Sequence, residues 1–195
     1  MASEINKNMG NNIQYSTSSI MDDFGRVFFK DNKVYRGISK KSVSECENLL
    51  NEPFFVKLME KGLVPKTTIC DDFGLEEYPL ILEHERLLDT YQYEWTFSMF
   101  KNAALAVLEI QSLCSKYGYE LKDAHPKNIL FRGNEAVYVD IGSFRKMQYE
   151  SWCAINEFVS SLYIPLSLWA NGEFYITRKL LESNLYKIRT IPHQD

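Results

Sequence analysis

The sequence contains few histidines and cysteines, and it has no long hydrophobic run. Its 195 residues include three histidines and four cysteines, and no two cysteines form a Cys-x-x-Cys pair. This spacing argues against a zinc ribbon, a structural metal site or a redox dithiol, and it favours buried thiols in a reducing compartment. No stretch approaches the roughly 18 apolar residues of a membrane-spanning helix, and the first twenty residues lack the apolar core of a signal peptide. We therefore expect a cytoplasmic protein that does not enter the membrane.

Basic residues and glycine-rich motifs are also scarce. Lys and Arg total 22 and Asp and Glu total 26, so the formal net charge is −4. We expect no nucleic-acid partner, because binding to a phosphate backbone requires a basic excess. Neither G-x-G-x-x-G nor G-x-x-x-x-G-K-[ST] occurs, which excludes the Rossmann and P-loop nucleotide sites. The hydrophobic share of 45% is that of a folded chain, and the length predicts one domain.

The first half of the chain is rich in strand patterns. Residues 26–29 and 33–36 predict a hairpin that turns at Asp31-Asn32. A helical stripe of apolar residues begins at Val43 and continues beyond Pro53. Proline is tolerated in the first turn of a helix, so Pro53 predicts either the start of a second helix or a bend in the first.

The second half is mainly helical and carries one small hairpin. The remaining expected elements are strands at 66–70 and 80–84, a helix from the N-cap Thr96 to Gly118, an extended piece at 120–122, a hairpin of 129–132 and 136–139, and helices from residue 149 onward, interrupted at Pro165. Regular βαβ alternation is missing, which argues against a doubly wound sheet. The predicted fold class is therefore α+β.

Three polar residues are spaced in a way that indicates catalytic chemistry. Asp123 is followed five residues later by Asn128, and Asp140 follows twelve residues after that, at the end of a predicted strand. Phosphoryl transfer from a nucleotide needs a carboxylate beside the acceptor hydroxyl and oxygen ligands for Mg²⁺. A loop that carries Asp and Asn, folded back by a hairpin onto a second Asp, supplies all three groups. Asp and Asn also favour ordinary turns, so a purely structural role is the alternative.

The run Leu121-Lys122-Asp123-Ala124-His125-Pro126-Lys127-Asn128, together with Val139-Asp140-Ile141-Gly142, resembles the catalytic loop and metal-binding segment of the protein-kinase-like superfamily. It is nearest to the aminoglycoside and choline phosphotransferases, whose loop reads H-G-D-x-H-P-x-N. The resemblance implies ATP and Mg²⁺ as cofactors. It also implies that Asp123 is the catalytic acid/base, that Asn128 and Asp140 are metal ligands, and that His125 and Pro126 shape the loop. Leu121 and Lys122 depart from the pattern, because they replace the histidine that braces the loop and the glycine after it.

The same resemblance implies a minimal two-lobed plan. It comprises a flexible segment 1–22, a small strand-rich N-lobe of about 23–84 and a mainly helical C-lobe of about 85–195. On this plan residues 80–85 link the lobes, and adenine would bind to their backbone.

The expected cofactor-binding residues are Arg36, Glu83, His84 and Glu85. Arg36 is the cation nearest the role of the phosphate-binding lysine, with Glu52 or Glu60 as its helix partner. An arginine at the end of a strand is also common as a solvated edge residue. No glycine-rich phosphate loop stands between the first strands, since residues 29–33 contain no glycine.

Most of the chain from Gly25 onward is also similar to an N-terminal region of some bacterial proteins labelled class I S-adenosylmethionine-dependent methyltransferases. The matching segments are Tyr93-Glu94-Trp95, Lys101-Asn102-Ala103-Ala104-Leu105, Leu121-Lys122-Asp123-Ala124, Val139-Asp140-Ile141-Gly142-Ser143-Phe144 and 158–168. This resemblance implies a kinase-like module with a methyltransferase domain or partner, and not methyl transfer by this chain itself.

Two functions stay open at this point. The first is an ATP- and Mg²⁺-dependent phosphotransferase that acts on a hydroxyl of a small molecule or sugar. The second is a non-catalytic, pseudokinase-like module that binds a nucleotide or a protein, as the incomplete small lobe and Leu121 indicate. The aromatic cluster of Tyr91, Tyr93, Trp95 and Phe97 is expected to pack inside the protein, and a ligand-stacking platform is its alternative role.

Overall fold

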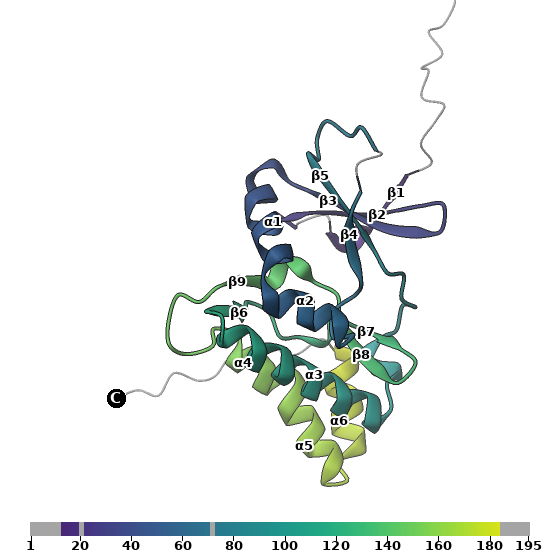
Figure 1. Cartoon of the computed structure of the whole chain (residues 1–195). Helices are drawn as coiled ribbons and strands as arrows, with labels where there is room; N and C mark the ends of the chain where they lie inside the picture. Colours follow the sequence, from purple (N-terminus) through teal and green to yellow (C-terminus); the bar gives the residue numbers. More distant parts are fainter. Residues whose placement is uncertain (1–12, 20–21, 71–72, 184–195) are drawn as a thin grey trace, which may run out of the picture. The chain divides into compact units, whose positions relative to one another are not determined.

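The computed structural model describes residues 13–19, 22–70 and 73–183, which fall into two compact units (Figure 1). The first unit comprises residues up to Asn48 and Lys66–Arg86, and the second comprises Leu49–Pro65 and the chain from Leu87. The first is rich in strands and the second is mainly helical, so the α+β fold class is confirmed. The order of elements is consistent with the kinase-like, two-lobed plan expected from the sequence.

An antiparallel sheet of five strands builds the first unit. Its strands are β1 (Gln14–Tyr15), β2 (Gly25–Lys30), β3 (Lys33–Ile38), β4 (Thr67–Ile69) and β5 (Leu80–His84), in the order β1-β2-β3-β5-β4. Asp31 and Asn32 both have positive φ angles, of 49° and 64°. A two-residue hairpin turn of this hand requires such angles, and Asp and Asn tolerate them better than most residues. The hairpin expected at this position is confirmed.

Strand β1 lies inside the segment 1–22 that the sequence predicts to be flexible. Residues 1–12, 20 and 21 lie outside the described part of the chain. Residues 13–19 form β1, which pairs with β2, and a 3₁₀ turn at Thr17–Ser19. The Ser19 hydroxyl accepts a hydrogen bond from Val27 N–H at 2.9 Å. The sheet therefore begins one strand earlier than the sequence pattern predicts, because a two-residue strand has no detectable period.

Aromatic side chains fill one face of this sheet. Phe28, Tyr35 and Ile81 are buried there with Phe73, and the Tyr35 and Phe73 rings lie 4.5 Å apart in an edge-to-face arrangement. Alternate residues of neighbouring strands share a face, which brings these side chains together. A β-carbon on Gly37 would lie 2.4 Å from the ring of Tyr78, so that ring packs directly on the backbone of β3.

Two consecutive helices separate β3 from β4. Helix α1 spans Val43–Asn51 and α2 spans Pro53–Glu60. Glu52 between them is extended, and Pro53 is the first residue of α2. Of the two outcomes expected for Pro53, the structure shows the start of a second helix. Gly62, with a φ of 71°, follows the end of α2.

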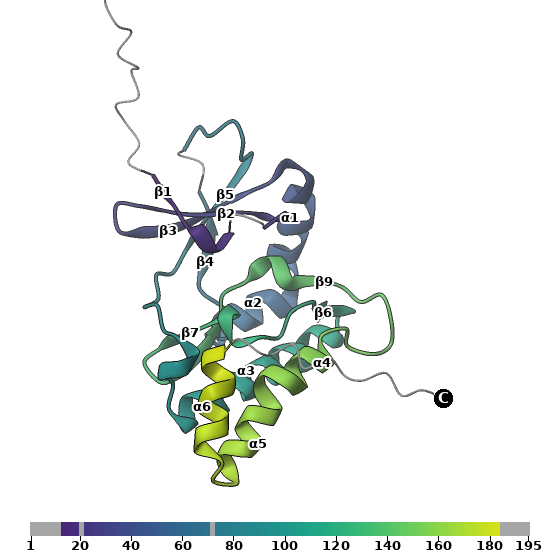
Figure 2. The same cartoon turned by 180° about the vertical axis from the view of Figure 1, so that it is seen from behind.

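The second unit combines the remaining helices with two small antiparallel ladders (Figure 2). Its elements are α2, α3 (Phe97–Ser115), β6 (Tyr119–Leu121), β7 (Ile129–Arg132), β8 (Glu135–Tyr138), β9 (Phe144–Lys146), α4 (Ile155–Phe158), α5 (Ile164–Ala170) and α6 (Phe174–Ser183). Strand β6 pairs with β9, and β7 pairs with β8 in the predicted hairpin. Helix α3 packs against β6 and β8.

Helix α3 begins and ends where the sequence predicts. The hydroxyl of Thr96 accepts a hydrogen bond from Met99 N–H at 3.3 Å, which satisfies one of the free amides of the first turn. Phe100, Val107 and Ile110 form its buried face. Gly118, with a φ of 72°, lies just beyond its end.

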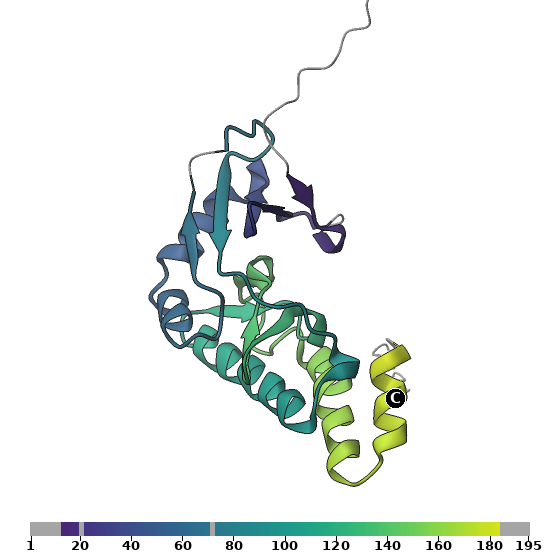
Figure 3. The same ribbon diagram turned by 90° about the vertical axis from the view of Figure 1, so that its right-hand side faces the viewer.

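The helical region after residue 149 departs from the prediction at Pro165. A π-helical segment, Val159–Tyr163, joins α4 to α5, and Pro165 lies in the first turn of α5. A proline inside a helix lacks an N–H and clashes with the preceding turn. The wider π turn just before it accommodates both effects, so the helical path continues instead of breaking. Helices α5 and α6 run side by side (Figure 3).

The sequence predicts that the cysteines and the aromatic cluster near α3 are buried, but only some members of each group are. Cys46 and Cys114 are buried, and burial raises the pKa of each thiol to about 12, whereas Cys153 is exposed. Trp95 is buried as predicted. Tyr91 and Tyr93 instead form an exposed stacked pair whose ring centres are 5.4 Å apart.

The helices of the described residues were compared with what a membrane span requires. None of them combines the length and the apolar composition that crossing a bilayer requires. Helix α3, the longest with 19 residues, contains Lys101 and Glu109.

We expect Phe54→Ala to lower the free energy of unfolding by about 3–5 kcal/mol, because it leaves a cavity among packed rings. Phe54 is fully buried, and its ring centre lies 4.9 Å from that of Tyr119. Val56→Ala is the matched control, because Val56 lies on the same helix and is 40% exposed. It should change stability by no more than about 0.5 kcal/mol. Equal urea midpoints for the two variants would contradict the packing described for α2.

Candidate functional site

The loop that carries Asp123 is tied to the turn after β8. Lys122 N–H donates to the backbone oxygen of Ser143 at 2.9 Å, and Asp123 N–H donates to the Ser143 hydroxyl at 3.1 Å. The loop then closes in a 3₁₀ turn, Pro126–Asn128, with Pro126 buried at its start. Asp123 itself is half-buried. Two segments that are twenty residues apart in the sequence are thus held together at the candidate base.

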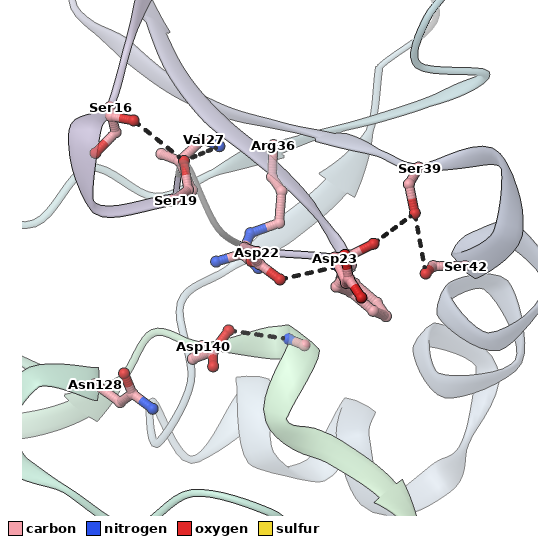
Figure 4. Close-up of polar contacts among 12 residues, drawn as sticks. Ser16, Ser19, Asp22, Asp23, Val27, Arg36, Ser39, Ser42, Asn128 and Asp140 are labelled. Atoms are coloured by element: carbon pink, nitrogen blue, oxygen red, sulfur yellow. Dashed lines mark hydrogen bonds and ion pairs between the residues drawn. The ribbon is translucent and has the colours of Figure 1, made fainter.

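Asp140 occupies the N-cap of a short 3₁₀ turn, Ile141–Ser143. Its Oδ1 accepts a hydrogen bond from Gly142 N–H at 3.2 Å, which Figure 4 shows as a dashed line. Its backbone oxygen accepts from Ser143 N–H at 3.1 Å. A carboxylate at such a cap has a fixed orientation, because the amide that it bonds belongs to the same turn.

Asn128 and Asp140 emerge from the same open end of the β7–β8 hairpin. The ladder pairs Ile129 with Tyr138, and it continues through a hydrogen bond of 2.8 Å from Val139 N–H to the backbone oxygen of Asn128. Asp140 is the next residue after Val139, so the hairpin register places it beside Asn128. Both side chains are drawn in Figure 4. The juxtaposition predicted from their spacing is therefore present in the second unit.

The hydroxyl of Tyr138 joins the loop to the hairpin. It donates to the backbone oxygen of Asp123 at 2.9 Å and accepts from Asn128 Nδ2 at 3.1 Å. Tyr138 is 1% exposed. Burial raises its pKa well above the ordinary value, and the charges of Asp140 and Asp123 add to this, while hydrogen bonds with Ser143 and Asn128 act in the opposite direction. The phenol therefore keeps its proton and remains a donor.

Sequence reasoning missed Tyr138, although the sequence contains a signal for it. Residues i and i+2 of a strand share a face, so Tyr138 in the strand that leads to Asp140 points toward the same side as Asp140. A buried tyrosine normally finds a partner for its hydroxyl. A tyrosine hydroxyl at this position therefore indicates a contact with the loop that carries Asp123 and Asn128.

Helix α4 and the π-helical segment hold the residue after Asp123 from two sides. Ala124 N–H donates to Glu157 Oε2 at 2.6 Å. The Ser161 hydroxyl lies 3.3 Å from the Ala124 backbone oxygen and 2.6 Å from the backbone oxygen of Glu157. Sequence reasoning missed both residues as well. Their separation of four residues puts two polar side chains close together on the helical face beside the buried Phe158 and Leu162.

A buried carboxylate fixes the strand that precedes the loop. Glu120, whose side chain is 1% exposed, accepts hydrogen bonds from Cys153 N–H and Arg145 Nε, each at 3.0 Å. Burial alone would raise the pKa of Glu120. The hydrogen bond from Cys153 and the Arg145 guanidinium outweigh it, so the pKa lies below its usual range. Removing one partner of such a buried pair leaves an uncompensated charge, which makes the contact costly to break.

Leu121, which departs from the family pattern, and His125, which matches it, lie beside this network. Leu121 is fully buried, and its N–H donates to Gln111 Oε1 at 2.9 Å. Its side chain is apolar and supplies no brace. His125 is half-buried, and its Nδ1 is a buried atom without a hydrogen-bond partner among the described residues.

In the first unit, Arg36 is a buried residue and not a solvated edge residue. It lies on β3 at 6% exposure, and its Nη1 forms an ion pair with Asp22 Oδ2 at 3.0 Å (Figure 4). The expected helix partners contact other residues or solvent. Glu52 Oε1 accepts from the Tyr119 hydroxyl at 3.0 Å and from Lys146 Nζ at 3.4 Å, and Glu60 is exposed. The partner from a nearby loop could not be read from a helical pattern.

Residues 80–84 of the segment expected to link the lobes form strand β5 of the sheet. Strand β5 pairs with β3 on one side and β4 on the other, and Glu85 N–H donates to the backbone oxygen of Lys66 at 2.8 Å. Glu83 forms an ion pair of 2.8 Å with Lys33. The chain passes from the first unit to the second after Arg86. The backbone of β5 is thus engaged in its own ladders, and binding of adenine by this segment stays a prediction.

His84, at the end of β5, has an unusual electrostatic environment. Its Nδ1 lies 2.8 Å from the Thr67 hydroxyl, and its Nε2 is buried with no partner among the described residues. Burial, assisted by the charge of Arg36, lowers its pKa from 6.5 to about 3. The ring is therefore neutral at neutral pH. Binding of a cofactor by Arg36, Glu83, His84 and Glu85 stays a prediction.

Asn128 and Asp140 offer oxygen atoms that suit Mg²⁺. Within the described ranges, no three side chains of His, Cys, Asp or Glu come close enough to hold a metal. Mg²⁺ commonly uses one or two carboxylates, together with water and substrate phosphates. Asn128 commits its Nδ2 to Tyr138, which directs Oδ1 away from that bond. The donor set fits this ion when phosphate oxygens complete it.

Comparison with known proteins places the sequence near one curated protein. No family model matches the chain. It is 32% identical over 162 residues to nodulation protein NoeA of Rhizobium meliloti (strain 1021). The match covers 77% of this chain and 32% of that protein, so the chain spans about a third of the length of this relative.

Among solved structures, the fold is similar to that of vaccinia related kinase 3. The TM-score is 0.49 at 12% sequence identity, and the similarity covers 73% of this chain and 50% of that one.

The depressed pKa of His84 predicts a loss of stability in acid. As the pH falls below about 6.5, the unfolded chain binds a proton that the folded chain refuses until about pH 3. The free energy of unfolding should therefore decrease through this window, by about 2 kcal/mol at pH 5 relative to pH 7. His84→Gln should lack this component. Thermal unfolding of both proteins across the window tests the assignment, which fails if the two pH profiles are parallel.

Proposed function

We propose that the chain is a kinase-like phosphotransferase that uses ATP and Mg²⁺ to phosphorylate a hydroxyl group of a small molecule or sugar. The observation that carries the proposal is the hydrogen-bonded connection of Asp123, Asn128 and Asp140 through Tyr138 and Ser143. In this proposal Asp123 is the catalytic acid/base, and Asn128 and Asp140 hold the metal.

The backbone contacts of Asp123 support its role as a base. Its N–H is bonded to Ser143, its backbone oxygen to Tyr138, and the next amide to Glu157. A general base must be held within hydrogen-bond reach of the hydroxyl that it activates. Phosphoryl transfer depends largely on such positioning, since little covalent chemistry falls to the protein. When bound, Mg²⁺ would neutralise charge on the phosphates of the nucleotide.

Arg36 is the proposed phosphate ligand of the first unit. It is a buried guanidinium that already pairs with a carboxylate, and the planar donors of arginine suit carboxylate and phosphate alike. The other elements of the proposal are a location in the cytoplasm and a methyltransferase domain or partner beside this module. Neither nucleic acid nor a membrane has a role in it.

Substitution of the three candidate residues tests the catalytic proposal. We expect Asp123→Ala and Asp140→Ala each to lower ATP turnover at least about 100-fold, because one loses the base and the other a metal ligand. Asn128→Ala should mainly raise the Mg²⁺ concentration needed for half-maximal rate. Glu150→Gln is the matched control, since it removes an exposed carboxylate from a loop outside the site. Equal turnover in all four variants and the wild type would remove the catalytic claim.

A non-catalytic, nucleotide- or protein-binding module is the second candidate function. Two observations favour it: Leu121 supplies no polar brace to the loop, and Arg36 is already paired with Asp22. A ligand that binds only the folded state must raise its apparent stability. At ATP concentrations about 100-fold above Kd, the gain is about 2.7 kcal/mol.

A thermal-shift titration therefore distinguishes the candidates. We expect ATP to raise Tm only when Mg²⁺ is present if the chain is an enzyme, since the metal ligands then take part in binding. A shift with ATP alone indicates a pseudokinase-like nucleotide binder. No shift in either condition indicates a protein-binding module.

A further inference from the structure

The Tyr138 hydroxyl is the one polar atom that contacts both the Asp123 backbone and the Asn128 side chain in the part of the chain that the structure describes. We infer that Tyr138 is a positioning residue that sets the orientation of the Asn128 amide, so that its oxygen and not its NH₂ group faces the metal. The inference rests on the proposed function and adds to it a residue that the family motif does not contain.

The argument depends on the single proton of a phenol. Tyr138 gives this proton to the backbone oxygen of Asp123, at 2.9 Å. Toward Asn128, 3.1 Å away, the same oxygen can then act only as an acceptor. Asn128 must therefore present Nδ2 to Tyr138 and Oδ1 to the opposite side. An amide in the reverse orientation would point two N–H groups at a cation and would leave the phenol oxygen facing another acceptor.

The surroundings of Tyr138 keep this arrangement fixed. The side chain is buried, and its ring packs edge-on to Phe144 with ring centres 6.1 Å apart. The hydroxyl cannot rotate its proton toward Asn128 without giving up the bond to Asp123, and a buried carbonyl without a donor is unfavourable.

Tyr138 also compensates for the departure at Leu121. In the family that this sequence resembles, a histidine at that position holds the loop, whereas Leu121 is apolar and fully buried. The Tyr138 hydroxyl reaches the loop from β8 instead. The loop is thus braced from the metal-binding hairpin itself, which couples the position of the base to the orientation of a metal ligand.

The test is Tyr138→Phe, which removes the hydroxyl and keeps the ring. We expect the Mg²⁺ concentration for half-maximal turnover to rise about 10- to 100-fold, the range found when a residue that orients a metal ligand is removed. The KM for ATP at saturating Mg²⁺ should change much less. Tyr119→Phe is the matched control: it removes a phenol hydrogen bond, to Glu52, from the same unit but away from the site. It should leave the Mg²⁺ dependence unchanged.

A double-mutant cycle with Asn128→Asp separates orientation from general support. A carboxylate offers two equivalent oxygens, so its metal binding does not depend on which end Tyr138 holds. Tyr138→Phe should therefore raise the Mg²⁺ requirement when Asn128 is intact and have little further effect when it is combined with Asn128→Asp. An equal effect in both backgrounds, or no effect in either, would overturn the inference.

A readout without turnover keeps the inference separate from the proposed function. If the wild type shows no Mg²⁺-dependent turnover, the proposed function fails. The side-chain amide signals of Asn128 in ¹⁵N NMR spectra then test whether Tyr138 orients this amide. We expect them to shift in Tyr138→Phe and to stay in place in Tyr119→Phe. Unchanged signals in Tyr138→Phe would overturn the inference on their own.

Discussion

The arrangement of the candidate site depends on one constraint: the backbone of a half-buried loop must find hydrogen-bond partners outside itself. Residues 122–128 form no strand and only one short turn, in which Asn128 N–H donates to the backbone oxygen of His125. The other backbone groups named above find their partners outside the loop. The partners come from the turn after β8, from a tyrosine on β8, and from the helical segment after residue 154. Each partner is a fixed element, and together they determine where Asp123 lies.

This constraint explains polar residues that would otherwise be unfavourable where they lie. Glu157 lies in α4 and Ser161 in the π-helical segment that follows it, and the buried apolar residues Phe158 and Leu162 are next to them. Glu120 is a carboxylate inside the protein, balanced by Arg145 and by a backbone amide. Buried polar groups are tolerated when they are fully bonded, and such networks favour one arrangement over its alternatives.

Much of the fold could be predicted because its signals are local. The hairpin at Asp31-Asn32, the break at Pro53 and the cap at Thr96 each depend on residues a few positions apart. The strands that were missed, β1 and β9, have only two and three residues. They exist because a partner strand, β2 for β1 and β6 for β9, offers them an edge, and sequence patterns do not contain that information.

In the candidate site too, only the residues with local signals could be predicted. Asp123, Asn128 and Asp140 could be predicted, because their spacing spans one loop and one hairpin. The partner of Arg36 could not, since Asp22 lies in a loop that no helical pattern includes. Residues 49–65 likewise belong with the second unit, although they precede two strands of the first. Their apolar residues Phe54 and Phe55 pack against Phe144, a contact across about ninety positions of sequence.

The contact between Gly37 and Tyr78 has a consequence for the first unit as a whole. Gly37 has no left-handed backbone angle, so space alone requires glycine there. The ring of Tyr78 covers the point on β3 where any other residue would place its first side-chain atom. One additional carbon at this position would lift the ring off the sheet and allow water to reach the aromatic cluster beneath it.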